Sequence, residues 1–258
     1  MIEIRNLYKS FDEKIVLNNV NLTVQPGTTK VVIGRSGVGK SVLLKIIMGL
    51  LRPDQGQVLI EGQEVTGLTE REYNKLRLEI GMVFQGGALF DSMTVEENVG
   101  FVLNEFMDLS RAEFVARVDA ALEMVGLMEM GHLFPSSLSG GMKKRVSIAR
   151  VLCMRPKFIL YDEPTDEVDP VTGDSLNNLI NKLRDQLKVT SIVVTHDMSA
   201  AFKVGNTIAM LYQGMLIADG TPEEIRTAYH PVVRQFIQGE ALGPIWDQEQ
   251  LVHQHLRG

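Results

Sequence analysis

A glycine-rich octapeptide, GRSGVGKS at residues 34–41, separates an apolar strand-like run from a segment whose apolar residues recur at helical spacing. Glycines here let backbone N–H groups approach a phosphate group, and the start of the following helix adds partial positive charge. The Lys40 ammonium suits the β- and γ-phosphate oxygens of a nucleotide, and the Ser41 hydroxyl suits Mg²⁺. The octapeptide therefore predicts a strand, a phosphate-binding loop and a helix. The residues expected to bind the nucleotide here are Arg35, Ser36, Gly37, Val38, Gly39, Lys40, Ser41 and Val42.

An acidic pair follows a second apolar run, FILY at residues 158–161. Ligands of open α/β sheets bind at the carboxyl ends of the strands, so Asp162 and Glu163 are expected beside the phosphate loop. Asp162 can hold Mg²⁺ directly or through water, and Glu163 can orient or deprotonate an attacking water molecule. Gln85 and His196 also follow strand-like runs. The Gln85 amide could contact Mg²⁺ or water and the His196 imidazole a γ-phosphate, although both residue types are also ordinary at strand ends.

The composition favours a globular protein with a small polyanionic ligand. Of 258 residues, 45% are hydrophobic, and 26 basic against 32 acidic residues give a formal net charge of −6. No long block of Lys or Arg occurs, so nucleic acid is not an expected partner. The single cysteine, Cys153, lies in a run typical of a buried helix face and fits a reducing compartment. No run approaches the roughly 20 apolar residues that cross a bilayer, and the N-terminus lacks signal-peptide features, so a membrane role would require a second subunit that spans the membrane.

The hydrophobic periodicity changes twice along the chain. Strand-like runs dominate residues 1–85, a period of 3.6 residues dominates residues 86–155, and strand-like runs alternate with helical segments over residues 156–240. Continuous apolar strands that alternate with helices predict a mainly parallel sheet with both faces covered. We therefore expect an α/β fold with an inserted helical segment, followed by a tail over residues 241–258.

A second glycine-rich element, LSGG at residues 138–141, has no evident role in a nucleotide site of its own chain. Together with the phosphate loop, Gln85, the acidic pair and His196, its order and spacing resemble the ATPase subunit of an ATP-binding cassette (ABC) transporter, over residues 1–240. The resemblance implies a RecA-like P-loop NTPase core, with an N-terminal antiparallel β region and a helical subdomain. It also implies a head-to-tail dimer with a second copy, in which each MgATP lies between one chain's phosphate loop and the other chain's LSGG element.

Further site residues follow from this resemblance alone. Phe11, in the turn between the first two strand-like runs, would stack on adenine, and Val16 would lie beside it. Gln85 would sense the γ-phosphate and lead into a segment, residues 86–98, that touches the membrane subunit. On the opposite side of the nucleotide, the residues expected to complete the site are Ser139, Gly140, Gly141 and Asp169. Ser139 is also expected to cap a helix that begins near Gly140.

The sequence departs from the family pattern at Asp166 and Glu167, where relatives usually carry small or apolar residues. Two extra carboxylates near a triphosphate should disfavour closure of the dimer unless a cation or a basic residue faces them. We expect both side chains to point to solvent. The alternative hypothesis is slower hydrolysis than in a relative with small residues there.

Met142 and the phrases FQGGALF at residues 84–90 and GGMKKR at residues 140–145 resemble the ATPases of Mla/Mce-type lipid transporters. That resemblance implies phospholipid or hydrophobic cargo, an integral-membrane permease, an Mce-domain lipid-binding protein, a STAS-domain protein, and a place on the cytoplasmic face of the bacterial inner membrane. The basic run KKR is expected to be a solvated helix face, and the C-terminal tail to support assembly.

Three other functions stay open from the sequence. A cassette ATPase for a different cargo would carry the same motifs. A soluble cassette ATPase acting on ribosomes or DNA usually has two fused cassettes or a long coiled-coil insertion, which are not found in this chain. A nucleotide-gated scaffold would fit only if the two extra carboxylates silenced hydrolysis.

Overall fold

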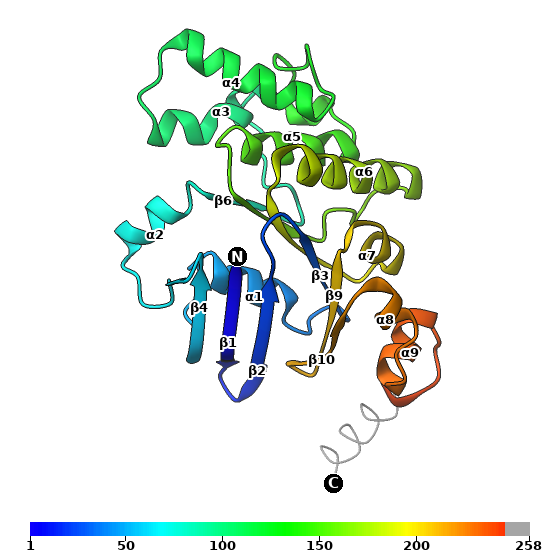
Figure 1. Cartoon of the computed structure of the whole chain (residues 1–258). Helices are drawn as coiled ribbons and strands as arrows, with labels where there is room; N and C mark the ends of the chain where they lie inside the picture. Colours follow the sequence, from blue (N-terminus) through cyan, green and yellow to red (C-terminus); the bar gives the residue numbers. More distant parts are fainter. Residues whose placement is uncertain (246–258) are drawn as a thin grey trace.

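The computed structural model describes residues 1–245 and is organised around a six-stranded sheet (Figure 1). The strand order is β10-β9-β3-β8-β7-β6, with β10 antiparallel to β9 and the other neighbours parallel. The expected mainly parallel sheet is confirmed. Its strands are β3 (Thr29–Ile33), β6 (Ile80–Val83), β7 (Phe158–Asp162), β8 (Thr190–Thr195), β9 (Thr207–Tyr212) and β10 (Met215–Gly220).

Both faces of this sheet are buried. Successive side chains of a strand point to opposite sides, and each side belongs to its own hydrophobic cluster. In β7, Ile159 and Tyr161 belong to one hydrophobic cluster, and Phe158 and Leu160 belong to the other. One cluster includes residues of α1 (Lys40–Ile47). The other includes residues of α5 (Gly140–Leu152), α6 (Pro170–Leu187) and α7 (Met198–Val204).

The N-terminal region forms a second sheet, in the order β2-β1-β4-β5, with antiparallel pairing throughout. Its strands are β1 (Ile2–Phe11), β2 (Lys14–Val24), β4 (Gln55–Ile60) and β5 (Gln63–Glu64). The expected antiparallel β region is therefore present. Helix α2 (Glu70–Leu76) was not expected from the sequence. It is short and buries only Tyr73, so it leaves almost no hydrophobic periodicity, although Thr69 and Glu72 form a capping box at its start.

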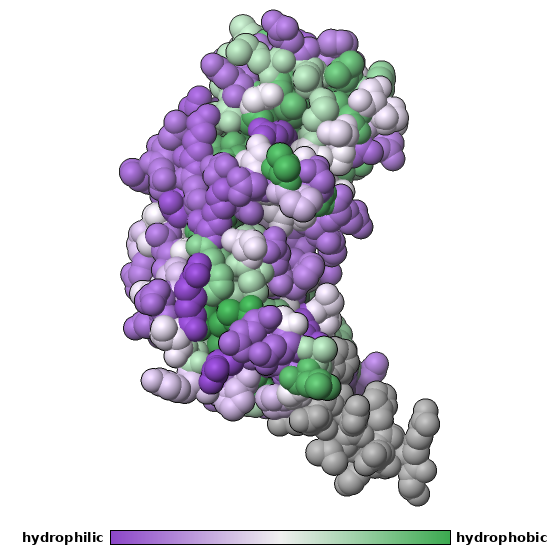
Figure 2. All heavy atoms as spheres, turned by 90° about the vertical axis from the view of Figure 1, so that its right-hand side faces the viewer, coloured by the Kyte–Doolittle hydropathy of each residue, from purple (hydrophilic) through white to green (hydrophobic). Residues whose placement is uncertain are grey.

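Residues 86–155 fold into helices and connecting segments without a strand, as the periodicity predicts. The helices are α3 (Val95–Phe106), α4 (Arg111–Met124), η1 (Pro135–Ser137) and α5. Large hydrophobic side chains are exposed on this subdomain at Phe106, Met128 and Phe134. Hydrophobic surface also gathers over the helical part of the molecule in Figure 2. Cys153 is buried directly after α5, in agreement with the apolar run around it.

The described chain ends beside α8 (Pro222–Arg226) and α9 (Pro231–Gln238). Ile245 is buried, and its backbone N–H donates to Gln235 Oε1 at 2.9 Å. Most of the expected C-terminal tail, residues 246–258, lies outside the described residues. No helix of residues 1–245 has the length and apolar character needed to span a membrane.

Candidate nucleotide site

The glycine-rich octapeptide forms the loop between β3 and α1. Gly39 precedes α1 with a φ of 114°, and a Cβ atom there would lie 2.9 Å from the Val16 carbonyl oxygen. Only glycine fits both this backbone conformation and this approach. The Lys40 ammonium turns back into the loop and donates to the carbonyl oxygens of Gly34 at 2.7 Å and Arg35 at 3.1 Å. The loop thus holds a buried cation at the start of a helix.

A pair of oxygen ligands lies next to this cation. The Ser41 hydroxyl donates to Asp162 Oδ1 at 2.8 Å, and Asp162 is the last residue of β7. Burial raises the pKa of the Asp162 carboxyl, and the adjacent Glu163 carboxylate raises it further, whereas the hydrogen bond from Ser41 lowers it. A divalent cation would stabilise the ionised form, and hydroxyl and carboxylate oxygens are the ligands that Mg²⁺ prefers. This pair therefore fits Mg²⁺.

Glu163 is a buried carboxylate with partners on both oxygens. Its Oε1 lies 3.2 Å from the Lys40 ammonium. Its Oε2 accepts hydrogen bonds from His196 Nδ1 at 3.0 Å and from the His196 backbone N–H at 3.2 Å. The Glu163 φ of 47° is in the left-handed region, which is uncommon for a residue with a side chain. Its N–H donates to the Val194 carbonyl oxygen of β8, so the sheet holds this conformation in place.

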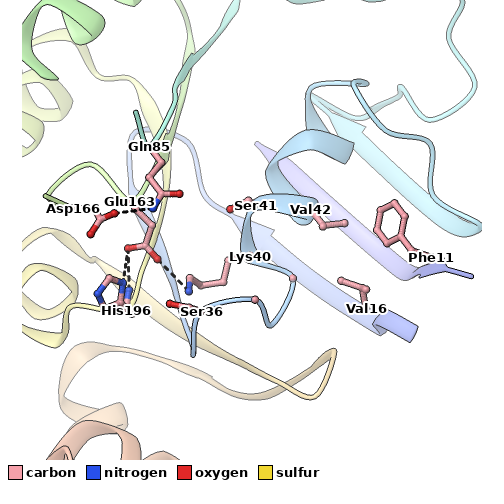
Figure 3. Close-up of a pocket in the computed structure, with 12 residues that line it drawn as sticks. Phe11, Val16, Ser36, Lys40, Ser41, Val42, Gln85, Glu163, Asp166 and His196 are labelled. Atoms are coloured by element: carbon pink, nitrogen blue, oxygen red, sulfur yellow. Dashed lines mark hydrogen bonds and ion pairs between the residues drawn. The ribbon is translucent and has the colours of Figure 1, made fainter. Parts of the chain in front are cut away.

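Lys40, Ser41, Glu163 and His196 line a cavity of about 510 Å³ (Figure 3), and Asp162 is hydrogen-bonded to Ser41 but is not among the lining residues. One end is polar and the other is apolar, as a nucleotide requires. The lining residues are Phe11, Val16, Ser36, Gly37, Gly39, Lys40, Ser41, Val42, Gln85, Glu163, Asp166 and His196. Phe11 is not in a turn as expected: it ends β1 and pairs with Lys14 across the hairpin. Its ring is partly exposed at the apolar end, where Val16 also lies (Figure 3).

Several expected site residues lie outside this cavity. Arg35 and Val38 line an adjoining cavity of about 400 Å³, together with Val16, Ser36 and Gly37. The LSGG element forms the start of α5, where Ser139 accepts a hydrogen bond from the Met142 N–H at 3.3 Å. The expected cap is therefore confirmed. Ser139 and Gly140 are exposed, and Gly141 is buried.

Asp169 is also outside the cavity and exposed, at the start of α6. Its Oδ1 accepts from the backbone N–H groups of Val171 and Thr172, both at 3.0 Å. The bonds to Thr172 hold the pKa of Asp169 below its usual value. In its own chain, Asp169 is therefore a helix cap.

The expectation that Asp166 points to solvent is wrong. Asp166 is half-buried and lines the cavity, where its Oδ2 accepts a hydrogen bond from Gln85 Nε2 at 2.7 Å (Figure 3). Glu167 is exposed, as expected. Gln85 can donate to a carboxylate placed here because both residues follow neighbouring strands of the central sheet, β6 and β7.

The expectation of a solvated KKR helix face is also wrong. Lys144 is only 6% exposed, and its ammonium donates to the Gln85 carbonyl oxygen. Arg145 donates to the Val125 carbonyl oxygen and to Ser175 Oγ. Helical spacing is the sequence signal for this burial, since Lys144 shares the buried face of α5 with Gly141 and Ile148.

Burial lowers the pKa of Lys144, while the carboxylates of Asp166 and Glu167 act in the opposite direction. Lys144 therefore supplies a positive charge that interacts electrostatically with both extra carboxylates. Compensation by a basic residue is the condition under which the Asp166 and Glu167 carboxylates should not disfavour closure of the dimer. Slower hydrolysis stays a prediction, but repulsion by the two carboxylates supports it less, because Lys144 offsets their charge.

Comparison with known proteins agrees with this geometry. The ABC transporter family profile matches residues 17–166. The chain is 39% identical over 249 residues to the probable ribonucleotide transport ATP-binding protein mkl of Mycobacterium leprae, across 96% of this chain and 72% of the relative. It is 37% identical over 245 residues to the intermembrane phospholipid transport system ATP-binding protein MlaF of Haemophilus influenzae, across 95% of this chain and 93% of the relative.

Solved structures give the same picture. The dimeric ATP-binding cassette MJ0796, in a post-hydrolysis state bound to ADP and Pi, superposes with a TM-score of 0.79. The two sequences are 35% identical, and the match covers 86% of this chain and 99% of that chain. The two sequence relatives are named for different cargoes, a ribonucleotide and a phospholipid.

Proposed function

The chain belongs to the ABC transporter ATPase family, and from that premise we propose that the cavity around Lys40 binds MgATP and hydrolyses it to drive transport of a phospholipid or other hydrophobic molecule. Proteins of this family are ATPases that work as dimers with membrane permease subunits. The observation that carries the assignment is the convergence of Lys40, Ser41 and Glu163 on one cavity, with Asp162 hydrogen-bonded to Ser41 beside it. The adjoining cavity, which is also lined by residues of the phosphate loop, has no carboxylate in its lining.

Each side chain has a distinct task in this proposal. Lys40 and the loop N–H groups bind the phosphates. Ser41, Asp162 and the Gln85 amide would hold Mg²⁺, which neutralises phosphate charge when it is bound. Phe11 stacks on the adenine ring, with Val16 beside it.

Glu163 is the proposed general base. In the nucleotide-free chain its Oε1 is paired with Lys40. Phosphate oxygens would replace Glu163 as the partner of Lys40, so Oε1 could accept a proton from the attacking water. The bonds from His196 to Oε2 hold the carboxylate in orientation during this exchange.

A direct test of this site compares the full-length chain with a Lys40→Ala variant. We expect Mg²⁺-dependent release of phosphate from ATP by the parent chain, and loss of both nucleotide binding and hydrolysis in the variant. Binding can be measured with a fluorescent ATP analogue. Undiminished binding by the variant would remove the cavity around Lys40 as the nucleotide site.

We also propose that a second copy completes the site. Ser139, Gly140 and Gly141 would present helix N–H groups to the γ-phosphate bound by the partner chain, and Asp169 would contact that chain. The exposure of Ser139 and Gly140 supports this. A lack of ATP-dependent dimers of Glu163→Gln in light scattering would contradict it.

The cargo and membrane partners rest on resemblance. The phospholipid transport ATPase MlaF supports a lipid cargo, whereas the protein mkl favours a ribonucleotide as the alternative cargo. Under the lipid proposal, the partners are a permease, an Mce-domain protein and a STAS-domain protein, at the cytoplasmic face of the bacterial inner membrane. An apolar cavity of about 270 Å³ around Phe84, Phe90 and Phe101 supports a permease contact near residues 86–98.

Purification of tagged Glu163→Gln from detergent-solubilised native membranes tests these partners. Mass spectrometry of the co-purified proteins and lipids should find a permease with an Mce-domain subunit and phospholipid. A different permease would reassign the cargo. Recovery of soluble partners alone would overturn the transport proposal and leave the ATPase intact.

The C-terminal tail is a separate proposal. Deletion of residues 240–258 should weaken assembly of the dimer or of the complex, which a sizing column would show. Unchanged elution would assign no assembly role to the tail.

A further inference from the structure

Gln85 is held at both its side chain and its main chain. Its amide Nε2 donates to Asp166 Oδ2 at 2.7 Å, and its carbonyl oxygen accepts from the Lys144 ammonium. Gln85 follows β6, Asp166 follows β7, and Lys144 belongs to α5. Three separate elements therefore fix one residue at the edge of the nucleotide cavity.

The contact with Asp166 decides which end of the Gln85 amide faces the cavity. An ionised carboxylate only accepts hydrogen bonds, so the amide nitrogen has to face Asp166 and the amide oxygen has to face away. Figure 3 shows the Gln85 oxygen turned toward Ser41. Mg²⁺ takes oxygen ligands, so only this orientation of the amide is useful to a metal beside Ser41.

The charge on Asp166 is compensated within the chain. The Lys144 ammonium interacts electrostatically with Asp162, Glu163 and Asp166. Lys144 is buried, which strengthens such interactions. Lys144 therefore offsets negative charge that these three carboxylates bring to the cavity wall.

We propose that Asp166 is a positioning residue for Mg²⁺: it orients the Gln85 amide so that Oε1 faces the metal held by Ser41 and Asp162, with Lys144 as its counter-charge. Carboxylates that hydrogen-bond a metal ligand typically change metal affinity when they are removed, because they fix the direction of the ligand. This inference rests on the proposed role of Gln85 as a metal ligand. It also assigns a function to an acidic residue that replaces the small residue of the family pattern.

The test measures how much Mg²⁺ strengthens nucleotide binding. The full-length chain is titrated with a fluorescent, non-hydrolysable ATP analogue, once with Mg²⁺ in excess and once with EDTA. The ratio of the two dissociation constants is the affinity gain that Mg²⁺ provides. Asp166→Ala should lower this gain by about tenfold, the lower end of the usual range because the hydrogen bond is exposed. Binding in EDTA should stay unchanged.

Two variants make the test specific. Asp166→Asn keeps an oxygen that accepts from Gln85 Nε2 but adds an NH₂ donor, so it no longer fixes which end of the Gln85 amide faces the metal and should restore only part of the gain. Glu167→Ala is the matched control, because this neighbouring carboxylate is exposed and does not line the cavity. Its Mg²⁺ gain should equal that of the parent chain.

Three results would overturn the proposal. An unchanged gain in Asp166→Ala would show that Asp166 does not orient the amide. Weaker binding in EDTA by the same factor would show a structural role. A larger gain, or faster hydrolysis, would show that Asp166 holds Gln85 away from the metal and would favour the hypothesis of slowed hydrolysis.

Gln85→Ala and Ser41→Ala separate this inference from the function on which it rests. Both should lose the Mg²⁺ gain if Gln85 and Ser41 are metal ligands. A loss in Ser41→Ala alone would remove Gln85 as a ligand and leave the metal site standing. A loss in both, with an unchanged Asp166→Ala, would reject only the role of Asp166.

Discussion

The phosphate loop at residues 34–41 and the LSGG element at residues 138–141 are both glycine-rich and both lie at helix N-termini. Only the phosphate loop is surrounded by the carboxylate and imidazole groups that ATP hydrolysis requires. Around Lys40, the ends of β7 and β8 bring Asp162, Glu163 and His196 together. At the start of α5, Ser139 and Gly140 are exposed and are not part of that cavity.

The difference shows that similar local chemistry does not make similar sites. A parallel sheet collects the side chains at the carboxyl ends of its strands, so the loop after β3 gains neighbours from distant parts of the chain. Ser139 and Gly140, at the start of α5, do not line the cavity at that edge. A second copy could supply the missing groups by placing its own phosphate loop there.

The largest expected effect concerns the site that is complete within one chain. Glu163→Gln should keep ATP binding but lower the rate of hydrolysis by about 10²- to 10⁴-fold, because the amide cannot accept the proton of water. Steady-state phosphate release and binding of a fluorescent ATP analogue measure the two properties. Normal hydrolysis would contradict the role of Glu163 as the base.

A mixing experiment tests the site that is incomplete. Lys40→Ala and Ser139→Arg should each be inactive alone, the first without a phosphate site and the second with a blocked partner surface. Random mixing should restore about a quarter of the parent activity, because half of the dimers would contain one intact site of two. Continued inactivity of the mixture would show that the sites do not combine residues of two chains, or that one site cannot work alone.

Alanine substitutions at Gly140 and Gly141 of the LSGG element should distinguish a residue that packs against α6 from a residue that contacts the partner chain. A Cβ atom at Gly141 would lie 2.3 Å from Thr172 Cγ2 of α6, whereas one at Gly140 would meet nothing closer than 3.8 Å. Gly141→Ala should therefore lower the free energy of unfolding by about 1–3 kcal/mol. Gly140→Ala, the matched control, should leave stability unchanged and affect only ATP-dependent dimer formation. Urea unfolding would measure the stability of both variants. Equal stability would refute the tight contact between α5 and α6.

The smallest effect concerns the other end of α5, where burial raises the pKa of Cys153 to about 11. In the unfolded chain this thiol ionises near pH 8.5. A raised pKa in the folded chain stabilises the fold fully below pH 8.5, and this contribution is lost as the pH rises toward 11. Between these values, the parent chain should lose more stability than Cys153→Ala does. Parallel urea titrations at several pH values would show the difference, and identical pH slopes would mean that the thiol is solvated.

The motifs could be predicted from sequence because each depends on neighbours along the chain. The loop at residues 34–41 carries its own glycines, cation and hydroxyl, and Asp162 ends a strand that is apparent from its apolar run. Ser139 is predictable as a helix cap for the same reason, because it caps the helix that begins at the next residue. Helix α2 is not predictable in this way, because its apolar pattern is too short to recognise.

The sequence alone determined which functional groups are present and that two glycine-rich segments, residues 34–41 and 138–141, lead into helices. Only the tertiary structure decided how the parts pair: that Glu163 bridges Lys40 and His196, that Asp166 holds Gln85 from 81 residues away, and that Lys144 is buried beside them. Periodicity reports which face of an element is buried, but the direction of a polar side chain depends on charges and hydrogen-bonding groups brought in from other strands and helices.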